Sequence, residues 1–235
     1  MFTLSDEFQL ESASRPGREH QRSERNNQDA LSIARDQRAL VLVVADGCSQ
    51  GGQSELGAVL GARWLARCGL ARHDSPEALA EQLDRHLLAR LAELLASLDP
   101  DARAETIAES LLFSWLLARV TPELTWVLGC GDGCWSLDRQ LQRRAPGPDN
   151  APPYSAYGLV EGMEAPRCEV LATLPTSELH HLVLASDGLE DLPPEAFDEL
   201  LDQPGTNPQR LPRLLRRHAR ALPDDTSVLL LRRRA

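Results

Sequence analysis

The chain has 235 residues, a length that suits one domain, residues 1–235, with a full hydrophobic core. Its apolar fraction of 42% and charged fraction of 26% are ordinary for a globular protein. Its net charge of −10 argues against nucleic acid or an anionic membrane as a partner, because an acidic surface repels both.

The cysteines indicate the cellular compartment more than a bound metal. The chain has five, an odd number at dispersed positions, and it shows no signal peptide. This pattern favours reduced thiols and a cytoplasmic location. Cys130 and Cys134 lack the spacing and the second pair of a zinc site, so we interpret them as buried side chains. No apolar run approaches the ~20 residues of a membrane span.

The N-terminal part predicts strands around a charged loop. In residues 1–16 apolar side chains alternate loosely, which predicts an edge strand. Residues 17–29 are polar and charged, a pattern typical of a solvated loop. Residues 30–34 and 40–45 predict two strands joined by a tight turn. A two-residue loop at residues 37–38 would place Asp29 opposite Asp46, and a shift by one or two residues would keep both carboxylates at the same end.

Helices and strands then follow in blocks. Apolar spacing predicts helices over residues 54–70 and from Ser75 to Leu98, the second ended by Asp99-Pro100. Residues 145–169 are rich in proline and glycine and predict an irregular segment, either a flap or a surface excursion. The remaining expectations are strands at 111–120, 124–130, 134–137, 140–143, 181–185 and 226–232, with helices at 195–201 and 207–222. Hairpins between the strands favour an α+β fold with antiparallel sheets.

Aspartates mark the ends of four of these strands. Three apolar runs stop on Asp-Gly, at Asp46, Asp132 and Asp187, and a fourth run follows Asp224. Antiparallel pairing would bring these carboxylates to one edge of a sheet, and the chain has no lysine to neutralise them. Like charges at short range repel strongly, so the cluster predicts bound cations. Carboxylates suit Mg²⁺ or Mn²⁺, and two such ions suit attack on phosphorus.

Five ordered motifs resemble the PPM (type 2C) metal-dependent serine/threonine phosphatases, from about Gly17 to the C-terminus. Gly17-x-x-His20 is similar to a compact bacterial branch of that family. The motifs are Asn27-Gln28-Asp29-Ala30, Val44-Ala45-Asp46-Gly47 with Ser54-Glu55-Leu56-Gly57-Ala58, Gly131-Asp132-Gly133, Ala185-Ser186-Asp187-Gly188 and Asp224-Asp225-Thr226-Ser227-Val228.

This resemblance implies two antiparallel sheets packed face to face, flanked by helices. It implies hydrolysis of phosphoserine or phosphothreonine in proteins without a phosphoenzyme, within a cognate serine/threonine kinase system. It also implies Mg²⁺ or Mn²⁺, two ions with a third, weaker site. Asp46 would bridge the two ions and Gly47 would offer its carbonyl. Further ligands would be Asp187 and Asp224 for one ion and Asp132, with Asp187, for the weaker site; Asp29 would act through a metal-bound water.

Three positions depart from the family pattern. Gln28 replaces a glutamate, and Glu24 stands where a phosphate-binding arginine is usual. The segment Cys48-Ser49-Gln50-Gly51-Gly52 replaces a His-Gly-Gly that offers a leaving-group acid. We therefore hypothesise that His20 supplies the proton and that Arg22 or Arg25 binds the phosphate.

Two alternatives stay open. Residues 47–51 match Gly-x-Ser-x-Gly, so a serine hydrolase would use Ser49 with Asp187 and His218. Against it, Gly51-Gly52 would break the helix that must follow the serine. The other alternative is a catalytically weak or inactive binding module of the phosphatase fold, which the departures at Glu24 and Gln28 favour. Retention of the metal-binding aspartates argues for activity.

Overall fold

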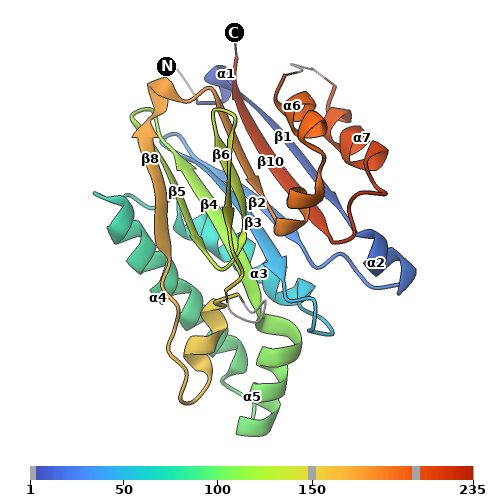
Figure 1. Cartoon of the computed structure of the whole chain (residues 1–235). Coiled ribbons are helices and arrows are strands. Elements are labelled where there is room, and N and C mark those ends of the chain that lie inside the picture. Colours follow the sequence, from blue (N-terminus) through green and yellow to red (C-terminus); the bar gives the residue numbers. More distant parts are fainter. Residues whose placement is uncertain (1–3, 148–151, 203–206, 235) are drawn as a thin grey trace.

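Two five-stranded antiparallel sheets pack face to face in the computed structural model, which describes residues 4–147, 152–202 and 207–234 (Figure 1). This architecture confirms the expected α+β sandwich. One sheet has the order β1 (Phe8–Arg15), β10 (Thr226–Arg233), β9 (His181–Ala185), β6 (Gly133–Leu137) and β7 (Gln140–Arg144). The other has the order β2 (Ala30–Arg35), β3 (Leu40–Gly47), β4 (Phe113–Val120), β5 (Leu124–Cys130) and β8 (Glu169–Pro175).

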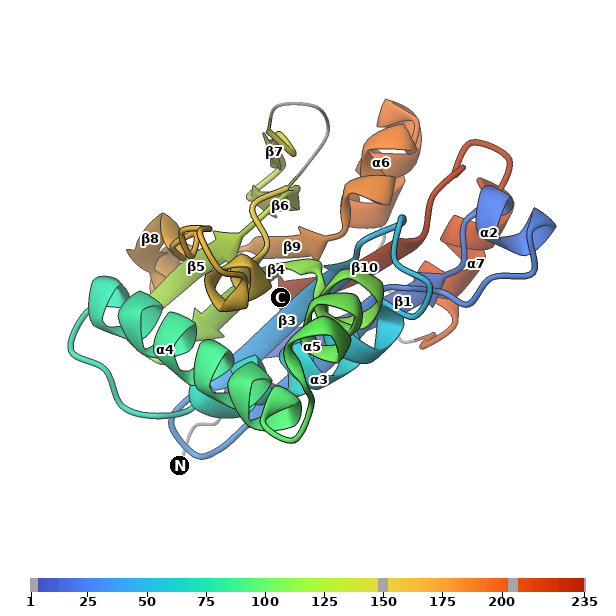
Figure 2. The same cartoon turned by 90° about the horizontal axis from the view of Figure 1, so that it is seen from below.

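Helices cover the outer face of each sheet. Figure 2 shows α3 (Glu55–Cys68) and α4 (Pro76–Leu95) over the sheet of β3 and β4. The other sheet packs against α6 (Pro194–Asp202) and α7 (Arg210–Arg217), whose buried leucines join the core of that layer. Shorter helices are α1 (Leu4–Glu7), α2 (Arg18–Arg22) and α5 (Pro100–Thr106), followed by a π-helical turn, Ile107–Leu111.

Strand β3 shows why the sandwich forms. Its residues alternate between two apolar layers, since Val41 and Val43 pack toward the helices while Leu42 and Val44 face the opposite sheet. A strand buried on both faces needs a continuous apolar run, which residues 40–45 supply. The β2–β3 register is the expected one, with Ala30 opposite Ala45. Asp36 fixes the turn, because its Oδ1 accepts the N–H groups of Arg38 and Ala39.

Several expectations need correction. Helix α4 ends at Leu95, and Asp99 begins a helix because its Oδ1 accepts the N–H of Ala102 at the start of α5. Helix α7 is shorter than the expected 207–222. Strand β8, which begins where the irregular segment ends, is not among the expected strands.

Part of the irregular segment 145–169 is anchored to the core. Tyr154 and Ser155 are buried, and the indole N–H of Trp115 donates to Ser155 Oγ at 3.2 Å. A short 3-10 helix follows, Ser155–Leu159. Two more 3-10 turns occur at Thr176–Glu178 and Asp187–Asp191. Residues 154–156 of the segment therefore pack onto the sheet, whereas residues 161–165 are exposed; the role of a flap stays a prediction.

Candidate metal centre

Both sheets deliver aspartates to the same end of the sandwich. Asp46 ends β3 and Asp132 lies in the turn from β5 to β6, while Asp187 follows β9 and Asp224 precedes β10. The expectation of one sheet edge was therefore wrong, but the convergence is real. A cavity of about 60 Å³ brings these residues together with Gly47. Its other lining residues are His20, Gln28, Cys48, Ser49, Ser114, Pro152, Tyr154 and Asp225.

The aspartates raise one another's pKa. Burial and the neighbouring carboxylates, Asp29 first, hold the pKa of Asp46 well above its ordinary range. Burial raises the pKa of Asp29 to about 7, against an opposing hydrogen bond from Ser186. Burial, with Asp132 and Asp224, raises the pKa of Asp187 to about 6. Burial is also the largest cause of the raised pKa of Asp132 and of Asp224. The cluster thus holds more negative charge than the protein alone can stabilise.

Buried oxygens without a partner indicate which kind of ligand the cluster fits. Among the described residues, Asp29 Oδ1, Asp187 Oδ1 and Gln28 Oε1 are buried without a hydrogen-bond partner. An unpaired buried oxygen costs free energy that a cation can repay. Hard divalent ions prefer carboxylate and carbonyl oxygens, so this donor set fits Mg²⁺ or Mn²⁺.

Glycine at position 47 lets the chain pass through this site. A Cβ built on Gly47 would lie 2.7 Å from Ser54 Oγ and 2.8 Å from the Gln28 carbonyl oxygen. The Gly47 N–H also donates to that carbonyl, at 3.2 Å. The Asp-Gly pattern therefore reflects close backbone packing as well as the chemistry of the aspartate.

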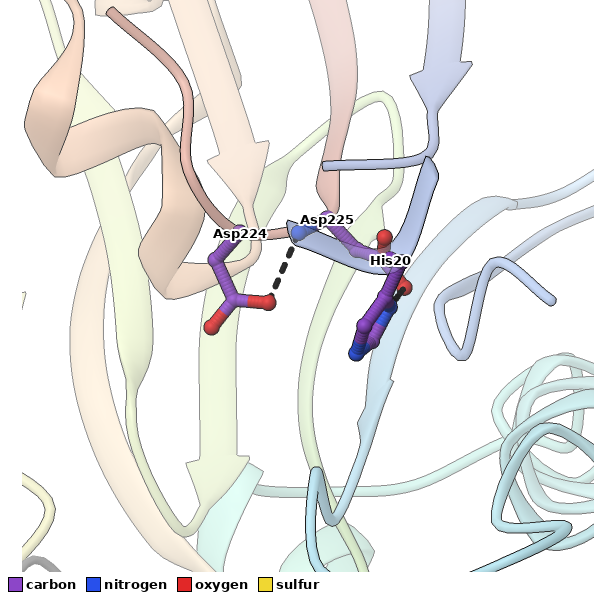
Figure 3. Close-up of side chains that lie close together, drawn as sticks. All are labelled: His20, Asp224 and Asp225. Atoms are coloured by element: carbon purple, nitrogen blue, oxygen red, sulfur yellow. Dashed lines mark hydrogen bonds and ion pairs between the residues drawn. The ribbon is translucent and has the colours of Figure 1, made fainter. Parts of the chain in front are cut away.

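His20 is held at the cavity by Asp225 (Figure 3). Its Nδ1 lies 2.9 Å from Asp225 Oδ2, and His20 is only 7% exposed. Asp225 also accepts the N–H of Gly17 at 2.7 Å and that of Gln28 at 2.6 Å. Its own N–H donates to Asp224 Oδ1 at 2.8 Å. One ligand atom from each of His20, Asp224 and Asp225 fits within 4.8 Å of the others.

Asp225 is a site residue that the sequence analysis named only within a motif. The signal available was the Asp-Asp pair before β10, but spacing alone gives no reason to separate the two acids. The structure separates them, since Asp224 lines the aspartate cluster while Asp225 ties the loop of residues 17–28 to β10.

The two candidate phosphate-binding arginines differ in their contacts, and neither lines the cavity. Arg22 is exposed at the end of α2. Arg25 donates from Nη1 to the Ser49 carbonyl at 2.7 Å and from Nη2 to the Gly51 carbonyl at 2.5 Å. Gln28 Nε2 donates to the same Gly51 carbonyl at 3.0 Å. A glutamate at position 28 has no side-chain N–H and could not make the last of these three bonds to residues 48–52.

The geometry does not support the serine hydrolase. Helix α3 begins at Glu55 rather than at the serine. Ser49 and Asp187 line the cavity, but His218, which follows α7, does not. A nucleophile elbow needs serine and base within hydrogen-bond reach.

A family model described as protein phosphatase 2C matches residues 16–225. The chain belongs to this family. It is therefore a hydrolase of the protein serine/threonine phosphatase class, as the motifs predicted. No curated protein matches the chain in sequence.

Solved structures share the fold of this phosphatase. Stp1, a serine/threonine phosphatase from Staphylococcus aureus, is 14% identical with a TM-score of 0.68, covering 100% of this chain and 98% of its own. PppA of Pseudomonas aeruginosa is 19% identical with a TM-score of 0.67, covering 97% and 98%. The catalytic domain of PstP, in complex with two manganese ions, is 17% identical with a TM-score of 0.62, covering 97% and 99%. In the part of this chain that the structure describes, no helix is long and apolar enough to cross a bilayer.

Proposed function

We propose that this phosphatase hydrolyses phosphoserine and phosphothreonine in proteins with two Mg²⁺ or Mn²⁺ ions, without a phosphoenzyme. The observation that carries the proposal is that aspartates from both sheets converge on one cavity. Buried side-chain oxygens of this cluster have no hydrogen-bond partner among the described residues. Asp46, Asp187, Asp224 and the Gly47 carbonyl would hold the two ions, and Asp132 with Asp187 would hold a third more weakly. When bound, the ions supply the positive charge that offsets the carboxylates and acidifies water for attack on phosphorus.

Asp29 would orient the attacking water. Its Oδ2 accepts the hydroxyl of Ser186 at 2.7 Å, which fixes the carboxylate, while Oδ1 has no partner among the described residues. A carboxylate locked on one oxygen presents the other in a defined direction, and such pre-ordering lowers the barrier to attack.

His20 would donate the proton to the departing serine or threonine oxygen. Asp225 holds Nδ1, so Nε2 is the ring atom left for the substrate (Figure 3). A carboxylate on the far nitrogen fixes the orientation and the tautomer of the ring, which keeps Nε2 directed at the substrate. In this chain that acid would replace the histidine that many relatives carry after the first Asp-Gly.

For the phosphate we propose Arg22 as the ligand and Arg25 as a support of the loop at residues 48–52. The support is the difference in contacts, since Arg25 uses both Nη groups on loop carbonyls. Arg22→Ala would then raise KM for phosphopeptide, whereas Arg25→Ala would also lower kcat by loosening Cys48 and Ser49. The partners we propose are cytoplasmic phosphoproteins and the serine/threonine kinase that phosphorylates them, a proposal that rests on the family.

The decisive experiment is hydrolysis of a phosphothreonine peptide with Mn²⁺, repeated with EDTA and with Asp46→Ala. We expect turnover that needs metal and is lost in the variant. Equal rates in all three reactions would reject the mechanism. Binding of phosphopeptide with Mn²⁺ but no turnover would instead support the inactive binding module.

A further inference from the structure

The free edge of β2 differs from the other sheet edges of this molecule. Strand β1 carries Glu11 as an inward charge, paired with Arg210. Strand β7 carries Arg143 and Arg144, and β8 has Pro175 and an irregular register against β5. Charges, prolines and bulges of this kind block the addition of a further strand.

Strand β2 has none of these devices over residues 30–34, and its one charge, Arg35, stands at the end of the strand. This stretch is Ala-Leu-Ser-Ile-Ala, without charge or proline, and its register against β3 is uninterrupted. In the described part of the chain, no hydrogen bond joins the backbone of residues 30–35 to anything but β3. The edge is therefore a row of free backbone donors and acceptors, and Ile33 on it is 44% exposed.

The hairpin geometry shows which groups face outward. Asp36 donates its N–H to the Ala39 carbonyl, so this pair at the turn is a hydrogen-bonded one. Hydrogen-bonded and non-hydrogen-bonded pairs alternate along an antiparallel ladder. The backbone groups of Leu31, Ile33 and Arg35 therefore point away from β3. An incoming strand would pair with these three residues.

Two grooves of different chemistry flank this edge. On the helix side, a groove of about 710 Å³ is lined by Arg63, Arg67, Arg90 and His86 and, among the described residues, by no aspartate or glutamate. Between the sheets, a groove of about 320 Å³ is lined mostly by apolar side chains, among them Phe8, Leu10, Leu40 and Leu231. Its charged lining residues are Arg35, Asp36 and Arg234. Ile33 contributes to both.

We propose that the β2 edge binds an extended segment of another protein in which acidic and apolar residues alternate. Side chains of an added strand alternate between the two faces of the sheet. Acidic side chains would lie in the arginine groove, where Arg63 and Arg67 form no ion pair with any described residue. Apolar side chains would lie over the groove between the sheets. In a chain with a net charge of −10, a groove lined only by basic charges selects an acidic partner.

This inference stands apart from the proposed chemistry. Neither groove shares a lining residue with the metal cavity. Strand β2 nevertheless begins at Ala30, next to Asp29. Its six residues span about 20 Å at a rise of ~3.3 Å per residue, so every residue of a bound segment would lie within about that distance of Asp29 along the strand. The surface would bring a substrate or a regulator to the enzyme.

The test uses a fluorescein-labelled octapeptide of alternating valine and glutamate, with anisotropy as the measurement. We expect saturable binding that EDTA leaves unchanged and that added NaCl weakens. Arg63→Glu with Arg67→Glu should weaken it about tenfold or more, because two attractive charges become repulsive. The matched control is Arg213→Glu with Arg216→Glu, the same charge change on exposed positions of α7, which should leave the affinity unchanged.

A backbone variant tests strand addition itself. Ile33→Pro removes an outward N–H but no bond to β3, so it should weaken the peptide about tenfold, while Ile33→Thr keeps the N–H and should retain most of the affinity. Hydrolysis of p-nitrophenyl phosphate checks that each variant is folded. Absence of binding, equal binding of a valine–lysine peptide, or equal affinity after charge reversal would overturn the proposal. So would a dimer, seen by sedimentation, that Ile33→Pro dissociates, since the occupant would then be a second copy.

Discussion

Two clusters in this molecule bury acidic side chains, and they differ in where the compensating charge comes from. Glu11 on β1 is 8% exposed and accepts two hydrogen bonds from Arg210, at 2.8 and 3.0 Å. Arg232 lies 3.5 Å from the same carboxylate. Both arginines also donate to the Leu200 carbonyl near the end of α6. This cluster balances its charge with its own residues.

The metal centre does the opposite. Asp29 is 7% exposed, as buried as Glu11, yet its neighbours are carboxylates and one of its oxygens has no partner. A folded protein tolerates such a cluster only by binding protons or cations. The comparison separates an acid that stabilises the fold from acids that need an external ion. Removal of one negative charge should therefore stabilise the metal-free protein when the charge is in the metal centre and destabilise it when the charge is that of Glu11.

Removing the charge of Asp46 should have the largest effect. Asp46→Asn keeps the shape of the side chain but lowers its affinity for a cation, so turnover of phosphopeptide should fall on the order of a thousandfold, or about 4 kcal/mol. In EDTA the same variant should unfold at higher urea concentration than the parent, because repulsion within the cluster decreases. A variant less stable than the parent in EDTA would show that Asp46 is balanced within the protein.

Glu11→Gln should show the reverse. Loss of this carboxylate removes the charge that the Arg210 side chain contacts at 2.8 and 3.0 Å, which costs roughly 3 kcal/mol of unfolding free energy. Hydrolysis by the folded enzyme should be unchanged, since Glu11 lies outside the cavity. Urea unfolding and steady-state kinetics on the same sample give both numbers. A fall in kcat without a fall in stability would contradict the assignment.

The contrast also explains what the sequence could predict. Strand-end aspartates and the β2–β3 register follow from local patterns, because strand period and turn length are properties of adjacent residues. The pairing of Glu11 with Arg210 joins residues at opposite ends of the chain, and no local pattern encodes it. The same holds for Asp225, whose contacts to Gly17, His20 and Gln28 span most of the sequence.

The other incorrect predictions concern segments whose local sequence fits more than one structure. The Asp99-Pro100 pair ends helices and begins them, so its sequence alone left α5 undetected. Strand β8 follows a proline-rich segment whose composition hides it. The strand-end aspartates were assigned to one sheet because the pattern gives the polarity of each strand but not its sheet.

His20 tests the boundary between the two kinds of cluster, because its Nδ1 contacts the buried Asp225 while Asp224 beside it lines the metal cavity. The loss of rate on removing the His20 side chain should depend on the leaving group of the substrate. His20→Ala should slow hydrolysis of a phosphoserine peptide about a hundredfold, the usual contribution of a general acid. It should slow p-nitrophenyl phosphate little, because nitrophenolate departs without a proton. Equal losses on both substrates would assign His20 a purely structural role.

The smallest effect we predict is the pH dependence of stability without metal. The folded-state pKa of Asp29, about 7, and of Asp187, about 6, exceed the ordinary value of 3.8. A group whose folded pKa is raised stabilises the protein below the ordinary pKa and loses that contribution as pH rises through the folded value. In EDTA, unfolding free energy should therefore fall from pH 5 to pH 8, by on the order of 2 kcal/mol.

Mn²⁺ should reverse this slope, because cations bind the deprotonated ligands. Asp46→Asn should flatten the slope in EDTA, whereas Glu11→Gln should lower the stability and leave the slope in place. Calorimetry across this pH range measures both the stability and its slope against pH. A slope that Mn²⁺ does not change would place the titrating groups outside the cluster.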